Sequence, residues 1–257
     1  MRYVKILAAL LAAAALPLLA GCGNTPAQES ASSALSSPSL WYVSKYPAGT
    51  KVKITQILYF SSGRVTPYNA SPGFTYSQIL GKSRQAILSE ALSMDKSQFE
   101  KSVKSDVASF EQIISTQKSI EEGASVAAGA SSAEGNEQAR AGQISSAQAA
   151  IAAAQKSIEN VEAASYKAPS PVPYTLSGST LSFTAPEASG GELASSCQQS
   201  LSCSSVLPSP YKEQTFSYSL SPAPVIEAGG KPFSGFRVGV GADASYIQTE
   251  SGDQFEL

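Results

Sequence analysis

The sequence predicts an α+β protein in which a long, coiled-coil-like antiparallel α-helical hairpin is inserted in a small antiparallel β-rich domain. Three observations predict this fold class. Residues 51–60 alternate between apolar and polar side chains, which is typical of a strand. Residues 75–165 instead repeat their apolar side chains at helical spacing. Alternation returns after prolines 169, 171 and 173, in residues 174–183, 215–220, 236–240 and 245–249.

The β-rich domain is expected to comprise residues 41–74 and 166–257. Aromatic residues begin at Trp41, and the strand at 51–60 ends at Ser61-Ser62-Gly63. A lone strand ahead of the helices would not be stable, so we expect it to join the strands that follow them. The helical hairpin, residues 75–165, then interrupts the domain.

The first helix of the hairpin is expected to begin after the loop at Pro72-Gly73. Thr75 and Gln78 have the spacing of a capping box, and no proline follows as far as Glu122. Asp95 and Gln98 have the same spacing, so a break near Met94 is the alternative. The apolar stripe consists of Leu88, Leu92, Phe99, Val103, Val107, Phe110 and Ile114.

The second helix carries a heptad seam with isoleucine at one position and mostly alanine at the other. The seam residues are Ile144, Ala147, Ile151, Ala154, Ile158 and Val161. Small side chains allow a partner helix to approach closely, and the first helix is the natural partner. Self-association through this seam is the competing interpretation. The prolines from 169 onward end the helix.

The N-terminus has the pattern of an export signal. Arg2 and Lys5 precede a Leu- and Ala-rich run that is too short for a membrane span of roughly 20 residues. The run ends in Leu19-Ala20-Gly21-Cys22, which resembles the lipobox of bacterial lipoproteins. An ordinary signal peptide with a chance cysteine is the alternative. Residues 1–21 are therefore expected to be a signal peptide, and residues 22–40 a flexible tether rich in Ser, Ala and Pro.

The lipobox resemblance implies that Cys22 carries a diacylglycerol thioether and, after cleavage, an acyl chain such as palmitate on its amino group. Several acyl chains make a lasting anchor, because a single chain binds a membrane only reversibly. Residue 23 is Gly, and in the Gram-negative sorting rule Asp at this position retains a lipoprotein at the inner membrane. The resemblance therefore implies the periplasmic side of the outer membrane.

The composition argues against several function classes. Lys and Arg total 18 against 20 Asp and Glu, so no basic surface is available for nucleic acid. Charged residues make up 15% of the chain, below the usual figure of roughly 25%. The chain contains no histidine, which removes the Ser-His triad and most zinc sites. We therefore expect no metal, no cofactor and no enzymatic activity.

With Cys22 assigned to lipid, Cys197 and Cys203 remain as a pair. An exported protein folds in a compartment that permits disulfides, so we expect these two cysteines to form a structural bridge. Their spacing differs from the Cys-x-x-Cys of redox motifs, and two cysteines without histidine make a poor metal site.

Two S-x-x-K sequences, Ser93 to Lys96 and Ser115 to Lys118, have the spacing of the nucleophile and lysine in penicillin-recognising enzymes. Neither K-T-G nor S-D-N accompanies them, and a helix rich in Ser and Lys produces such matches by chance. Catalysis at these sites is therefore not expected.

The sequence thus leads to one functional hypothesis and one alternative. The first is a lipid-anchored cell-envelope protein that acts as a non-enzymatic spacer or docking component. Its partners would be the membrane, through Cys22, and another envelope protein or a second copy, through the hairpin. The alternative is a lipoprotein that binds a cell-wall fragment, glycan or small molecule through its β-rich part.

Overall fold

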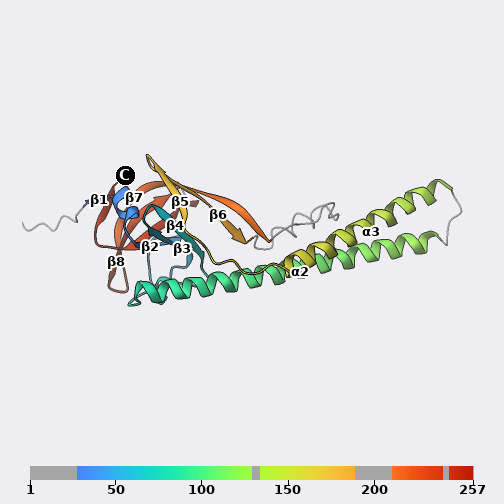
Figure 1. Ribbon diagram of the computed structural model, residues 1–257, viewed down its shortest axis with the longest axis horizontal. Helices are drawn as coiled ribbons and strands as arrows, with labels where there is room; N and C mark the ends of the chain where they lie inside the picture. Colours follow the sequence, from blue (N-terminus) through green and yellow to red (C-terminus); the bar gives the residue numbers. More distant parts are fainter. Residues whose placement is uncertain (1–27, 129–133, 189–209, 240–242, 257) are drawn as a thin grey trace, which may run out of the picture.

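The computed structural model describes residues 28–128, 134–188, 210–239 and 243–256, and its largest element is a closed β-barrel (Figure 1). Eight antiparallel strands form the barrel, in the order in which they occur along the chain. The strands are β2 (Ser39–Ser44), β3 (Ile54–Ser61), β4 (Arg64–Asn69), β5 (Val172–Ser177), β6 (Thr180–Ala188), β7 (Tyr211–Ala228), β8 (Lys231–Val238) and β9 (Ser245–Glu250).

The barrel closes where β2 pairs with β9, through Tyr42 opposite Gln248 and Val43 opposite Ile247. The two longest helices, α2 (Arg84–Ala128) and α3 (Glu134–Glu162), lie between β4 and β5 in the chain. The pairing of β4 with β5 is short and joins Arg64 to Pro173 and Val65 to Val172. The helix pair therefore leaves the barrel at the junction of β4 and β5.

The predicted fold class is wrong, because the strands form a barrel-dominated structure and not a small β-rich domain carrying a coiled-coil hairpin. The main physical reason lies in β7, of which the alternation indicated only residues 215–220. Pro222 and Pro224 obscure its continuation, and the register shifts between Ala223 and Ile226. One half of β7 pairs with β6 and the other with β8, so this strand joins the two parts of the barrel wall.

The interior of the barrel is filled by side chains. Trp41 is fully buried and stacks on Phe236, with ring centroids 5.8 Å apart, and it meets Phe60 and Phe255 at angled contacts. An eight-stranded barrel has an interior that is just wide enough for such a core. The main members of this cluster are Trp41, Val43, Leu58, Phe60, Val65, Leu181, Phe183, Leu220, Phe236 and Ile247.

Three short elements near the ends of the described chain lie beside this core. Strands β1 (Gln28–Ser30) and β10 (Gln254–Glu256) form a parallel pair, and α1 (Ala31–Ser36) follows β1. Ala31, Ala34 and Leu35 of α1 are buried within the barrel cluster, although this segment falls in the stretch expected to be a tether. The Ser- and Ala-rich composition of this segment gives no sign of the burial.

A second apolar layer covers the outside of β2 and β3. Tyr42 and Ile57 face outward and pack with the 3-10 turn η1 (Tyr76–Gln78) and with the first turns of α2, through Ile87 and Ala91. The helix begins at Arg84, where the backbone N–H of Ala86 reaches Ser83 Oγ at 3.3 Å. It then runs unbroken through Met94, so the alternative of two shorter helices does not apply.

The buried tyrosines of this outer layer predict unfolding at alkaline pH. Burial raises the pKa of Tyr76 from 10.0 to about 12, and it also raises the pKa of Tyr42. An unfolded tyrosine ionises near pH 10.0. The contribution of buried Tyr76 to the free energy of unfolding is therefore complete below that pH and is lost as the pH rises toward 12. We expect phenolate absorbance to increase and the circular dichroism signal to decrease together over this pH range. Tyr76→Phe should make the loss less steep, and titration of all tyrosines near 10 with the fold intact would contradict the assignment.

Candidate functional site

The helix pair places the six seam residues predicted from the sequence in two groups. Ala147, Ala154 and Val161 are buried against α2, whereas all three isoleucines are only half-buried. Ala150 and Ser157, which the heptad assignment omitted, are buried in their place. The contact line of α3 is therefore made mainly of alanine and serine.

The facing residues of α2 combine large apolar and polar side chains. Phe110 is fully buried, and Ile113 packs with it against Ala154 and Val161. Asp106 and Gln117 are buried on the same line of α2. Small residues on α3 leave room for these longer side chains, which is why the two helices fit together along an alanine-rich line.

The half-buried aliphatic residues form a stripe along one side of the helix pair. Viewed along its own helix from the N-terminus, each of these residues is rotated by about 100° or less from the buried line. The direction of the rotation is the same on both helices. Because the helices are antiparallel, that direction brings both sets to the same side of the pair. We call this set the side stripe, and it consists of Val103, Val107, Ile114, Ile144, Ile151 and Ile158. The opposite side carries small and hydroxyl residues such as Ser109, Ala149 and Ala153.

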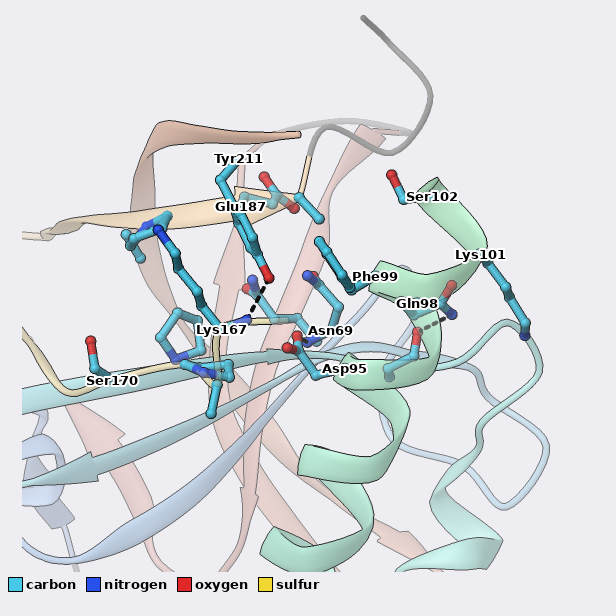
Figure 2. A pocket seen from close by; sticks show the side chains of 18 of the residues that line it. Asn69, Asp95, Gln98, Phe99, Lys101, Ser102, Lys167, Ser170, Glu187 and Tyr211 are labelled. Atoms are coloured by element: carbon cyan, nitrogen blue, oxygen red, sulfur yellow. Dashed lines mark hydrogen bonds between the residues drawn. The ribbon is translucent and has the colours of Figure 1, made fainter. Parts of the chain in front are cut away.

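A cavity of about 650 Å³ lies where the base of the helix pair meets the barrel (Figure 2). Its walls come from β3, β4, α2, the segment that follows α3, and the facing ends of β6 and β7. Such a volume is within the range of small-molecule sites, about 300–1,000 Å³. The lining residues include Gln56, Asn69, Asp95, Gln98, Phe99, Lys101, Ser102, Ser105, Lys167, Ser170, Glu187, Tyr211 and Phe216.

Asp95 of α2 is hydrogen-bonded to two other walls of the cavity, β4 and the segment after α3. Its Oδ1 accepts a hydrogen bond of 3.0 Å from the backbone N–H of Asn69, on β4. Its Oδ2 accepts a hydrogen bond of 3.0 Å from the hydroxyl of Tyr166, in the segment after α3. Burial raises the pKa of the Asp95 carboxyl, and these two hydrogen bonds oppose the effect. Asp95 therefore fixes the position of α2 relative to the barrel.

An aromatic pair forms the wall beside Asp95. Phe99 of α2 and Tyr211 of β7 are stacked, with ring centroids 5.1 Å apart. The Tyr211 hydroxyl accepts a hydrogen bond of 2.8 Å from the backbone N–H of Lys167, and the Lys167 ammonium lies 5.7 Å from the ring centroid. Figure 2 shows Phe99 beside Tyr211, with the Tyr211 hydroxyl pointing toward Lys167.

The other candidates from the sequence lie elsewhere. Both S-x-x-K pairs are on exposed faces of α2, and neither lines this cavity. Cys22, Cys197 and Cys203 are outside the described residues. Within the described ranges, no three side chains of His, Cys, Asp or Glu gather as metal ligands would. None of the helices described there has a stretch long and apolar enough to cross a bilayer.

Sequence reasoning missed the cavity because its walls come from six separate segments of the chain. Asp95 had been weighed only as a helix cap, and Phe99 only as part of an apolar stripe. Comparison of the chain with protein-family models, curated proteins and solved structures gives no significant match.

Proposed function

We propose that this chain is a lipid-anchored cell-envelope protein that acts, without catalysis, as a docking component through its helix pair. The observation that carries the proposal is the projection of α2 and α3 away from the barrel (Figure 1). The last residue of α2 that lines the cavity is Ser105. The helix continues from there to Ala128, which is about 35 Å at 1.5 Å per residue.

The packing of the helix pair supports a docking role. An alanine-rich contact line removes little apolar surface from water, so the pair gains limited stability from its own interface. The side stripe leaves six aliphatic residues half-exposed on one side. A partner helix laid along this side would complete their burial, as in recognition of an amphipathic helix by an apolar groove.

The anchor belongs to the same proposal. The lipobox resemblance at Cys22 supports attachment to the outer membrane on its periplasmic side, and the segment before Gln28 would connect the lipid to the barrel. The helix pair would then present the side stripe to another envelope protein at a distance from the barrel.

Crosslinking in intact cells tests this proposal. Ile114→Lys combined with Ile151→Lys places charge on the side stripe, while Ser109→Lys combined with Ala149→Lys places equal charge on the opposite side. We expect the stripe variant to lose crosslinks from α2 and α3 to an envelope protein, and the control to keep them. Mass spectrometry of the same preparation should find a lipidated peptide beginning at Cys22.

Circular dichroism of both purified variants should show unchanged helix content, because the substituted positions are half-buried or exposed. Equal crosslinking of both variants would contradict the docking role of the stripe. Crosslinks only between copies of this chain would replace the heterologous partner with self-association.

A further inference from the structure

Charged residues of both signs line the cavity. Two lysines, Lys101 and Lys167, and two carboxylates, Asp95 and Glu187, are among its lining residues. Figure 2 shows Asp95, Lys167 and Glu187 apart from one another, whereas the exposed Lys101 side chain runs from α2 away from these three. A strongly charged ligand would therefore meet charges of both signs, which is unfavourable for the desolvation of an ion.

The uncharged polar groups are also distributed over the walls. The amides belong to Gln56 on β3, Asn69 on β4 and Gln98 on α2, so they approach from both the barrel and the helix. The Gln98 Nε2 donates to the Ala70 carbonyl at 3.3 Å, which fixes the orientation of its amide. Amide groups both donate and accept hydrogen bonds, which suits a ligand with hydroxyl groups around its whole periphery.

Ser102 supplies a hydroxyl in the cavity wall whose hydrogen-bonding capacity is unused within the described part of the chain. It is 7% exposed and lines the cavity from α2, and its Oγ has no hydrogen-bond partner among the described residues. A buried hydroxyl without a partner is unfavourable, so such groups are normally satisfied by protein, water or ligand.

Apolar surfaces lie between these polar groups. Phe99 and Phe216 contribute aromatic carbon, and Pro169 and Pro186 contribute compact aliphatic rings. A lipid tail would leave the amides and Ser102 without partners, because it has no hydrogen-bonding groups. A pyranose ring presents both C–H surfaces and hydroxyls, and it therefore matches the two kinds of wall.

We propose that this cavity binds an uncharged saccharide, which is held by Gln98 and Ser102 and packs against Phe99. The site is separate from the side stripe, so saccharide binding and docking can fail independently. A hydroxyl of the bound saccharide would supply a partner for Ser102 Oγ.

Titration calorimetry of the full chain with N-acetylglucosamine and its β-1,4-linked dimer and trimer tests the proposal. We expect binding that weakens about tenfold in Gln98→Ala, as for loss of one well-formed hydrogen bond. Affinity should change little with salt, because no ion is bound. Ser109→Ala, on the same helix but away from the cavity, is the matched control and should bind as the parent does.

Ser102→Ala separates ligand binding from a structural role. Removing the unpartnered hydroxyl should leave the melting temperature of the free protein unchanged or higher, and should weaken saccharide binding. The proposal is overturned if none of the three saccharides binds at about 10 mM. It is also overturned if Ser102→Ala and Gln98→Ala bind as well as Ser109→Ala, or if decanoate binds and the saccharides do not.

Discussion

Replacing Trp41 with alanine is expected to destabilise the protein by about 3–5 kcal/mol, the usual range for removing a buried tryptophan. The indole is fully buried and contacts Phe60, Phe236 and Phe255, which come from both sides of the barrel and from β10. Its Nε1 donates to Ser39 Oγ at 2.9 Å, so its one polar group is satisfied. The substitution leaves a cavity lined by rigid rings, which cannot collapse easily.

Chemical denaturation followed by far-ultraviolet circular dichroism measures this loss. Tyr46→Ala is the control, because Tyr46 is 64% exposed and its truncation should change the free energy of unfolding by about 0.5 kcal/mol or less. Equal effects of the two substitutions would show that Trp41 is not the centre of the barrel core. Since Trp41 is the only tryptophan of the chain, its fluorescence in the parent protein follows barrel unfolding specifically.

Gly235→Ala is the second large effect that we expect. Gly235 lies on β8 with a φ of +154°, and a Cβ placed there would approach Ile247 O on β9 to 2.2 Å and Gln248 Cα to 2.8 Å. Both are backbone atoms of a paired strand, so they cannot move aside without disturbing the pairing of β8 and β9. We expect destabilisation of about 1–3 kcal/mol or more, as for overpacking of a rigid core.

Gly142→Ala is the matched control for this substitution. Gly142 lies within α3, and nothing lies within 4 Å of an added Cβ. Alanine is favoured over glycine inside a helix by about 1 kcal/mol, so this variant should be more stable than the parent. Thermal melts of the two variants should shift in opposite directions, and a normal melting temperature for Gly235→Ala would contradict the close approach of β8 and β9.

Local patterns in the sequence predicted individual helices and strands. Alternation marked the strand at 51–60, and the absence of proline after Gly73 marked a long helix. Ala147, Ala154 and Val161 were assigned to the seam from their spacing, and they are buried. The isoleucines of the predicted seam are half-buried beside this line, and Ile158 packs against the same cluster. Spacing alone does not distinguish a residue on the contact line from one about 100° beside it.

The cavity could not be predicted in the same way. Asp95 joins Asn69 and Tyr166, residues that are distant in the chain, and none of the three has a local pattern that indicates the others. The pairing of Phe99 with Tyr211 likewise depends on how the base of α2 meets the first residues of β7. Only the packing of the helix pair on the barrel brings these side chains together.

The sequence by itself determined the helical stretch, the alternating strands and the resemblance of residues 19–22 to a lipobox, because each depends on neighbouring residues alone. Tertiary structure decided that the strands close into a barrel, that β7 continues past Pro222 and Pro224, and that a cavity forms at the base of the helix pair. Closure depends on β2 meeting β9 from opposite ends of the described chain, and no local periodicity encodes a pairing over that separation.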